Sequence, residues 1–180
     1  LDDLVFGGWD LFEDNCYEAA AHAGVLEPSL LNQVKDDLSA IRPWTAVFDR
    51  RYVKRLDGPN VKKGASKKDL AEQLREDIRR FKRDNGLDRL VMIWCGSTEI
   101  FLTESPAHAT IEAFERGLEQ SDPTIPSSMI YAYAAIMEGV AYANGAPNLS
   151  ADVPALIALA QQRQVPVGGK DFKTGQTLLK

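Results

Sequence analysis

Leu90-Val-Met-Ile-Trp-Cys95 is a continuous apolar run, and the fold that the sequence predicts depends on it. This composition is typical of a strand in a parallel sheet whose two faces are both covered, because neither face then meets water. An amphipathic helix precedes the run, with Ser66 as its expected N-cap and Gly86 as its expected end. The apolar stripe of that helix comprises Leu70, Leu74, Ile78 and Phe81. A capped helix that leads into a buried strand predicts an α/β unit.

The same alternation of short apolar runs and capped helices continues in both directions along the chain. Further strands are predicted at residues 4–6, 140–143 and 165–167. Helices are predicted at residues 14–23, 28–41, 105–119, 126–139 and 153–163. Because crossovers between parallel strands are right-handed and carry helices, the sequence predicts a Rossmann-like α/β fold. We expect an open, mostly parallel sheet with helices on both faces.

The bulk composition is that of an ordinary globular protein with an acidic balance. The 180 residues contain 44% hydrophobic and 26% charged side chains, and the formal net charge is −5. This charge argues against nucleic acid or an anionic membrane as the main partner. The one dense basic stretch, residues 62–82, also carries carboxylates at helical spacing, so we interpret it as a solvated helix face.

Cysteine and histidine usage bounds the redox and metal chemistry. Cys16 and Cys95 lie far apart without a CxxC spacing, so we expect a reduced, cytoplasmic chain. His22 and His108 form no ligand pattern with a cysteine or a carboxylate, so no metal site is expected. The most apolar stretch, residues 129–143, is interrupted by Glu138, so no membrane-spanning segment is expected.

Polar turns rich in small residues follow the predicted strands. They are Gly7-Gly-Trp-Asp10, Cys95-Gly-Ser-Thr-Glu99, Asn144-Gly-Ala-Pro-Asn148 and Gly168-Gly-Lys-Asp171. In a parallel α/β sheet, ligands bind beyond the carboxyl ends of the strands. Each turn alone could serve only to let the chain leave its strand, but four such turns at one sheet edge predict a shared binding crevice.

The last turn opens the segment Gly168-Gly-Lys-Asp-Phe-Lys-Thr-Gly-Gln-Thr-Leu-Leu-Lys180. Its three lysines follow a predicted strand end, where backbone N–H groups and cations can converge on a phosphate or a developing oxyanion. A solvated basic turn would have a similar composition. The residues alone leave both interpretations open.

This segment resembles the GG-D-D-F-K-S-G-Q-T-K-x-K motif of the inositol-3-phosphate synthase (myo-inositol-1-phosphate synthase) family. Other stretches are similar to motifs of that family in the same order. Gly8-Trp-Asp10 resembles G-W-D-I, and Met92-Ile-Trp-Cys-Gly-Ser-Thr-Glu99 resembles V-L-W-T-A-N-T-E-R. Glu138-Gly-Val-Ala-Tyr-Ala-Asn-Gly-Ala-Pro-Asn148 resembles E-G-I-P-F-I-N-G-S-P-Q-N. The resemblance covers essentially the whole chain.

The chain also departs from the family pattern, as expected of a divergent, bacterial member. Lys170 stands where the motif has its first Asp, Thr174 replaces a Ser, and Leu178 replaces a Lys. In the middle of the chain, Cys95-Gly96-Ser97 stands for Thr-Ala-Asn. The loss of one lysine from an anion-binding segment leaves the exact substrate open.

The resemblance implies an enzyme with NAD as its cofactor and D-glucose 6-phosphate as its substrate. Such enzymes oxidise C5, enolise the resulting ketone, close the ring by an intramolecular aldol step and reduce C5 again. The product is 1D-myo-inositol 3-phosphate, and there is no net redox change. The resemblance further implies a homotetramer for the full-length protein, with no nucleic-acid or membrane partner.

Site residues are implied position by position. NAD would be bound by Asp10, Gly96, Ser97, Thr98, Asn144 and Gly145. The catalytic residues would be Lys173, Lys180 and Asp171, with the lysines as cations near the reacting oxygens. Substrate or phosphate would be bound by Gln176, Thr177 and Asn148.

The implied domain organisation places residues 1–167 in the NAD-binding Rossmann-like domain and residues 168–180 at the start of the catalytic and oligomerisation domain. The G-x-G-x-x-G fingerprint of dinucleotide-binding domains does not occur in the sequence. In the family a related loop lies upstream of the region matched by Leu1, so we expect an excerpt of a longer protein. Two alternatives remain open: an NAD-dependent oxidoreductase acting on a phosphorylated sugar, and a non-catalytic α/β binding module.

Overall fold

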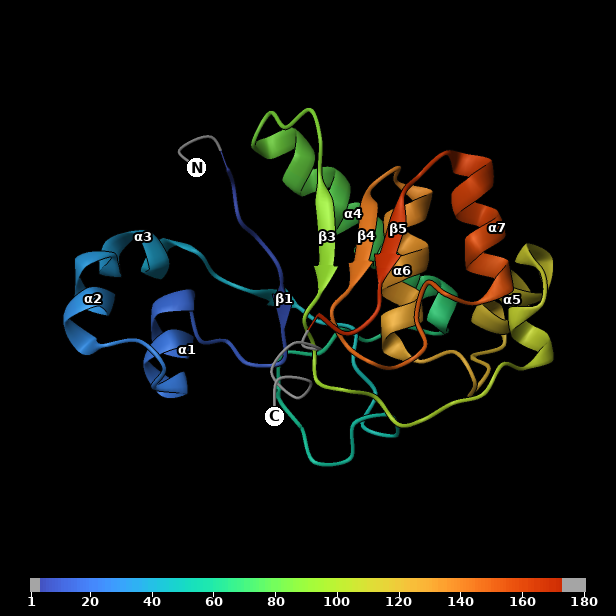
Figure 1. The fold of residues 1–180 in the computed structure, drawn as a ribbon, viewed down its shortest axis with the longest axis horizontal. Helices are drawn as coiled ribbons and strands as arrows, with labels where there is room; N and C mark the ends of the chain where they lie inside the picture. The colour runs from blue at the N-terminus through green and yellow to red at the C-terminus, as the bar shows by residue number, and fades with distance from the viewer. Residues whose placement is uncertain (1–3, 173–180) are drawn as a thin grey trace, which may run out of the picture. The chain divides into compact units, whose positions relative to one another are not determined.

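The computed structural model describes residues 4–172, in which the chain forms two compact units (Figure 1). The first unit comprises residues 4–48 and 56–62, and the second comprises residues 49–55 and 63–172. No helix within these described residues is both long and apolar enough to cross a membrane.

The first unit consists of short elements. Its helices are α1 (Cys16–Ala23), α2 (Pro28–Gln33) and α3 (Lys35–Ala40), and its parallel strands are β1 (Trp9–Asp10) and β2 (Trp44–Thr45). Reciprocal hydrogen bonds cap α1: the Asn15 side chain accepts from the Glu18 N–H at 3.0 Å, and the Glu18 carboxylate accepts from the Asn15 N–H at 2.9 Å. The indole rings of Trp9 and Trp44 meet edge to face at 5.0 Å.

The strand predicted at residues 4–6 is wrong. These residues lie outside every strand of the described chain, and their apolar side chains are exposed. Strand β1 forms later because its residues find a partner in β2, beginning with the bond from the Trp44 N–H to the Gly8 carbonyl at 2.8 Å. Apolar character alone therefore misplaced the strand by a few residues.

The single helix predicted at residues 28–41 is also wrong, because the structure has two helices there. Val34 separates α2 from α3, with φ of −114° and ψ of 18°. Val34 is β-branched, and such residues lose side-chain freedom in a helix. The apolar spacing of the segment carries no signal for a break at this position.

The second unit is built on a parallel sheet. In the described chain its strands are β3 (Val91–Trp94), β4 (Ala141–Asn144) and β5 (Val167–Gly169), in the order β3-β4-β5. Its helices are α4 (Lys67–Asp84), η1 (Pro106–His108, a 3₁₀ turn), α5 (Ile111–Glu119), α6 (Ser127–Met137) and α7 (Pro154–Arg163). Helices alternate with parallel strands along the chain (Figure 1), so the predicted α/β class is confirmed. Strand β5 runs through Gly169, and the predicted domain boundary at residue 168 stays a prediction.

Helix boundaries in this unit follow local capping chemistry. Ser66 caps α4 as predicted, because its hydroxyl accepts from the Asp69 N–H at 3.2 Å, and Gly86 ends the helix with φ of 60°. The helix predicted at residues 105–119 begins instead with η1, and α5 starts anew behind Thr110, whose hydroxyl accepts a first-turn N–H. A second capping residue thus divides the predicted helix.

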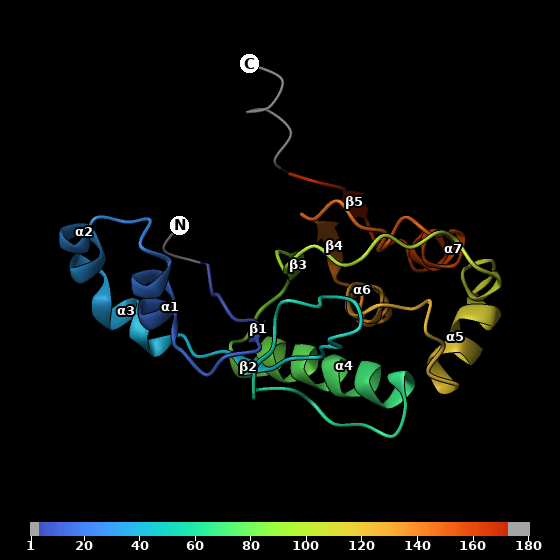
Figure 2. The ribbon, with the colours of Figure 1, turned by 90° about the horizontal axis from the view of Figure 1, so that it is seen from below.

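The core of the second unit surrounds α6, in which every residue from Ser127 to Ile136 is buried. Helices α4 and α7 both pack against α6, and α4 and α6 lie on the same side of the sheet (Figure 2). Tyr142 of β4 faces this layer, because its hydroxyl donates to the Ser128 carbonyl at 3.4 Å. The sheet and its helices therefore share one apolar layer.

Strand β3 is an edge strand of the described sheet, and β4 is the central one. The prediction that both faces of β3 are covered is wrong for the described residues. Met92 is only 9% exposed, but Val91 and Ile93, which point to the opposite face, are 68% and 53% exposed. A continuous apolar run could not reveal this, because it supplies apolar side chains to both faces whether or not both are covered.

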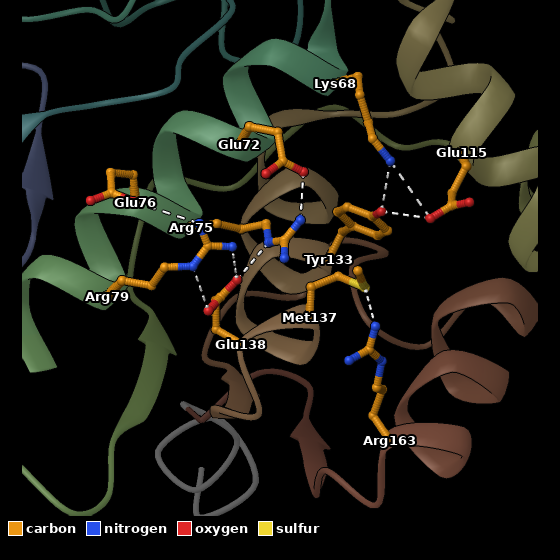
Figure 3. A network of polar contacts seen from close by, with 10 residues as sticks. All are labelled: Lys68, Glu72, Arg75, Glu76, Arg79, Glu115, Tyr133, Met137, Glu138 and Arg163. Carbon is orange, nitrogen blue, oxygen red and sulfur yellow. Dashed lines mark hydrogen bonds and ion pairs between the residues drawn. The ribbon is translucent and has the colours of Figure 1, made fainter.

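Ion pairs fix the carboxyl end of α6 to α4 (Figure 3). Glu138 accepts from Arg75 Nε and from Arg79 Nη2, each at 2.6 Å. Burial alone would raise the pKa of Glu138, but the hydrogen bonds from Arg79 and Arg75 hold that pKa below its usual value. A second cluster between the same helices and α5 comprises Lys68, Tyr133 and Glu115.

Candidate cofactor site

The carboxyl ends of β3, β4 and β5 lie at one edge of the sheet, and the turns that follow them meet there. The Gly145 N–H donates to the Trp94 carbonyl at 2.9 Å, which joins the turn after β4 to the end of β3. The Asp171 N–H donates to the Ala146 carbonyl at 3.1 Å, which joins the turn after β5 to the turn after β4. The three predicted turns of the second unit therefore come together. The prediction that all four turns follow strands of one sheet is wrong, because the turn at residues 7–10 belongs to β1, which pairs with β2 in a separate sheet.

The turn after β3 is exposed at residues 96–98. A Cβ atom on Gly96 would come within 2.7 Å of the Trp94 indole, so glycine allows the backbone to lie against this ring. Ser97 and Thr98 add hydroxyl groups, which can hydrogen-bond to a ribose or a phosphate. The predicted contacts of these residues with NAD stay predictions, and the exposed backbone is compatible with them.

The Asn144 amide is engaged within its own turn. Its Nδ2 donates to the Asn148 carbonyl at 2.8 Å, its Oδ1 accepts from the Ala146 N–H at 2.9 Å, and the residue is buried. Glycine follows because a Cβ atom on Gly145 would lie 2.8 Å from the Trp94 carbonyl. Asn144 thus shapes the turn, and contacts of Asn144 and Gly145 with NAD stay predictions.

Asn148 is buried beneath this edge. Its Oδ1 accepts from the Glu99 N–H at 3.3 Å, and its Nδ2 donates to Glu99 Oε2 at 3.0 Å and to Ser128 Oγ at 3.2 Å. A phosphate bound by the Asn148 side chain would have to replace one of these bonds. The predicted role of Asn148 in substrate binding stays a prediction.

The end of β5 and the turn after it contain backbone conformations that few residues adopt. Gly169 has φ of 116°, and Asp171 has φ of 57°, in the left-handed region. Lys170 Nζ pairs with Asp152 Oδ2 at 3.0 Å, and both side chains are exposed. The catalytic role of Asp171 stays a prediction. The other predicted residues of this segment lie outside the described residues: Lys173, Gln176, Thr177 and Lys180.

Asp10 belongs to the first unit, where it ends β1. Its carboxylate accepts from the Phe12 N–H at 3.1 Å, and its carbonyl accepts from Asn60 Nδ2 at 2.9 Å. These bonds fix the turn after β1 within its own unit. The predicted contact of Asp10 with NAD stays a prediction.

The comparison with known proteins identifies one family. The family model described as Myo-inositol-1-phosphate synthase, NAD_binding_5, matches residues 1–179. The chain belongs to the myo-inositol-1-phosphate synthase family. The resemblance inferred from four short motifs is therefore confirmed.

Similar proteins carry the synthase name. Inositol-3-phosphate synthase 1 of Bacteroides thetaiotaomicron is 49% identical over 100% of this chain and 42% of that protein. The inositol-3-phosphate synthase of Dictyostelium discoideum is 37% identical over 99% of this chain and 35% of that protein. The crystal structure of inositol-3-phosphate synthase from Caenorhabditis elegans superposes with a TM-score of 0.92 at 33% identity, over 99% of this chain and 35% of that one. The chain thus spans less than half the length of each of these synthases.

The matching model is that of an NAD-binding domain, which confirms NAD as the predicted cofactor of this synthase-family chain. The described residues also fit a nucleotide. Trp94 Nε1 is a buried donor without a hydrogen-bond partner in the described chain, and the indole lies against Gly96. Such donors are rare, and a ribose or phosphate oxygen at this edge would supply an acceptor. Between residues 4 and 172, no group of three or more His, Cys, Asp and Glu side chains is placed to hold a metal ion.

Sequence reasoning missed two buried charges of this synthase-family domain. Glu99 is 4% exposed and Lys67 is 5% exposed. Burial raises the pKa of Glu99 to about 7 and lowers the pKa of Lys67 to about 8. Lys67 Nζ donates to the Tyr52 hydroxyl at 2.8 Å and to the carbonyls of Asp122 and Ile125, each at 2.6 Å. Lys67 thereby fixes the loop that leads into α6.

A signal for Glu99 was present in the sequence. Helix α6 begins behind Pro126, which has no side-chain acceptor for the first-turn N–H groups. A buried helix with such a start needs an acceptor from elsewhere in the chain, and the carboxylate that ends the turn after β3 is a candidate. Lys67 gave a weaker signal, because two consecutive lysines at a helix start are typical of a solvated face.

Proposed function

We propose that this chain is the NAD-binding part of an inositol-3-phosphate synthase. The complete protein would convert D-glucose 6-phosphate to 1D-myo-inositol 3-phosphate, an isomerisation in inositol and phospholipid biosynthesis. The observation that carries the proposal is the 49% identity to the Bacteroides synthase over 100% of the chain. The exposed turn at residues 96–98 and the unpartnered Trp94 Nε1 support the placement of the nucleotide.

The proposed reaction is redox-neutral. Bound NAD would supply the hydride acceptor for oxidation at C5 and the hydride donor for its reduction after ring closure. The C5 ketone acidifies the C6 protons, and the resulting enolate attacks the C1 aldehyde. Negative charge develops on oxygen in these steps, so fixed ammonium groups are appropriate stabilisers. Lys173 and Lys180 are proposed for this role, with Asp171 orienting one of them.

The proposed cellular setting follows from the same family. We assign the complete protein to the cytoplasm, where cysteines such as Cys16 and Cys95 stay reduced. A homotetramer without nucleic-acid or membrane partners is proposed for the complete protein. Size-exclusion chromatography with light scattering tests the tetramer directly.

The decisive experiment is an assay of the complete protein with D-glucose 6-phosphate and a catalytic amount of NAD. Phosphorus NMR should detect inositol phosphate while the absorbance of NADH stays flat, because each hydride is returned. Stoichiometric accumulation of NADH would instead identify an oxidoreductase acting on a phosphorylated sugar. Absence of turnover would leave a non-catalytic binding module.

A further inference from the structure

Glu99 is a buried acceptor that joins segments distant in the sequence. Its Oε1 accepts from the Ser128 N–H at 2.9 Å, and its Oε2 accepts from Ser128 Oγ at 2.5 Å. Asn148 Nδ2 donates to the same Oε2 at 3.0 Å. Glu99 thus connects the turn after β3 to the first turn of α6 and to the turn after β4.

The amino end of α6 depends on this carboxylate. The helix is 11 residues long and begins behind Pro126 without a side-chain cap of its own. First-turn N–H groups are left unpaired by the helix itself and attract negative charge. Glu99 supplies both the acceptor and the charge to Ser128 from 29 residues away.

The network continues from Ser128 to the central strand. The Ser150 hydroxyl donates to the Ser128 carbonyl at 3.2 Å and lies 2.7 Å from the Tyr142 hydroxyl. Both Ser128 and Ser150 have no exposed surface, and Tyr142 lies in β4. A displacement of Glu99 would therefore be transmitted through Ser128 to β4 and to the segment that follows it.

We propose that Glu99 is a positioning residue for NAD binding, which holds the exposed turn 96–98 and the turn after β4 in the geometry that the nucleotide requires. The proposal rests on the proposed function, in which this edge binds NAD. Glu99 directly follows residues 96–98 in the chain, and its own N–H is fixed by Asn148 Oδ1 at 3.3 Å. The position of the turn is thus set at its last residue.

Burial and the neighbouring groups have opposing effects on the pKa of Glu99. Burial raises its pKa to about 7, against hydrogen bonds from Ser128 and the charge of Lys67, which lower it. Tyr52 and Tyr142 also face this region, and burial raises the pKa of both hydroxyls, to about 12 for Tyr52, so both stay neutral. Among the groups of residues 4–172 named here, Glu99 and Lys67 are the ones whose pKa values lie near neutral pH.

The test compares Glu99→Gln with Glu138→Gln in the complete protein. Both changes remove one carboxylate that contacts α6, but Glu138 lies at the opposite end of the helix from the cofactor edge. A glutamine at position 99 can serve the Ser128 N–H only by turning its own NH₂ group toward the donors on its other side, including Asn148 Nδ2. Glu99→Gln therefore disrupts the hydrogen-bond network while the volume of the side chain stays nearly the same.

Isothermal titration calorimetry measures the NAD dissociation constant of each variant at several pH values. Glu99→Gln should weaken NAD binding about tenfold or more at about pH 8, the scale for a hydrogen bond to a charged group. Glu138→Gln should stay within about twofold of the wild type while its melting temperature falls. The wild-type affinity should decline from about pH 8 to about pH 6 as Glu99 takes up a proton, and Glu99→Gln should show a flat profile.

Ser128→Ala provides a second variant if Glu99→Gln does not fold. It keeps the backbone N–H bond to Glu99 and removes the hydroxyl bond that favours the carboxylate, so the midpoint of the pH profile should move upward. An unchanged midpoint, or Glu99→Gln binding NAD as tightly as the wild type, would overturn the positioning role while leaving the proposed function intact. A wild-type protein that does not bind NAD would overturn both.

Discussion

The two ends of helix α6 are each held by a glutamate, and the two glutamates behave in opposite ways. At the amino end, Glu99 is bound by the neutral groups of Ser128 and Asn148, and burial raises its pKa to about 7. At the carboxyl end, Glu138 is bound by Arg75 and Arg79, and its pKa is lowered against the effect of burial (Figure 3).

The helix dipole alone would give the reverse order of pKa values, with a lowered pKa at Glu99 and a raised pKa at Glu138. A carboxylate is favoured at a helix amino end and disfavoured at a carboxyl end. At Glu99, burial outweighs the dipole and the hydrogen bonds from Ser128. At Glu138, two guanidinium groups outweigh both the dipole and burial. Burial at Glu99 and the two guanidinium groups at Glu138, not the place of each carboxylate on the helix, decide their pKa values.

Within one helix, the Glu138 end bears on the stability of the fold and the Glu99 end bears on the geometry of the candidate site. The Glu138 end has charges that neutralise one another, so it stabilises the packing of α6 against α4 over a wide pH range. The Glu99 end keeps a costly buried charge at the edge where the turns after β3 and β4 meet. Departures from the most stable arrangement are expected at functional sites.

The largest effect is expected for the pH dependence of stability in Glu99→Gln. The folded-state pKa of Glu99 is about 7 and its ordinary value is 4.5, so between these values the folded protein binds more protons than the unfolded one. Wild-type stability should therefore fall as pH rises from 4.5 to about 7, by about 3 kcal/mol from this group. Urea denaturation of the complete protein at a series of pH values should show that Glu99→Gln lacks this decline. If the free energy of unfolding depended on pH in the same way in both proteins, the raised pKa of Glu99 would be contradicted.

The next largest effect is expected for Glu138→Ala. Removing this carboxylate leaves the part-buried Arg75 paired with Glu72 and the more exposed Arg79 paired with Glu76, so the loss should be about 2 kcal/mol at neutral pH, less than for a fully buried pair. The lowered pKa of Glu138 gives the opposite sign to Glu99: its contribution is present above the ordinary pKa and is lost as pH falls through the folded-state value.

A matched control for Glu138→Ala is Glu76→Ala. Glu76 also pairs with Arg79, at 3.6 Å, but its side chain is 59% exposed, so its loss should cost less than about 0.5 kcal/mol. Urea denaturation measures both variants. Equal losses would mean that burial does not distinguish the two ion pairs.

The sequence was sufficient for the class of the fold and for the sheet edge at which the turns after β3, β4 and β5 meet. Apolar runs followed by small polar residues placed β3 and β4 within one residue of their observed bounds, because strand ends in parallel sheets carry such turns. The resemblance in four motifs identified the family. Both inferences used local signals that the fold preserves.

The buried partners of the site could not be predicted in this way. Phosphate binding by Asn148 stays a prediction, and the sequence carried no signal that the Asn148 amide is engaged by Glu99 and Ser128. The pairing of Glu99 with Ser128 spans 29 residues, and no periodicity connects two such positions. The covered or exposed state of β3 likewise depended on which strands and helices surround it, which an apolar run does not encode.

Smaller effects are expected from substitutions of two glycines, Gly139 just after α6 and Gly96 just after β3. Gly139 has φ of 70° with open space around a Cβ atom, so Gly139→Ala should cost about 1 kcal/mol through backbone strain and leave NAD affinity unchanged.

Gly96 lies against the Trp94 indole, so Gly96→Val should displace this ring and weaken NAD binding while the fold persists. Calorimetry with NAD and thermal denaturation separate the two outcomes. Unchanged NAD affinity in Gly96→Val would remove Gly96 from the cofactor site.

The smallest effect is expected for the ion pair between Lys170 and Asp152. The two side chains meet at 3.0 Å but are 44% and 42% exposed, so water and salt screen their attraction. Lys170→Ala should therefore change the free energy of unfolding by less than about 0.5 kcal/mol, and the change should shrink further at high salt. Urea denaturation at low and high ionic strength measures it. A loss as large as that of Glu138→Ala would mean that an exposed ion pair contributes as much to the free energy of unfolding as the part-buried pairs of Glu138. Burial would then no longer explain the contrast between the two ends of α6.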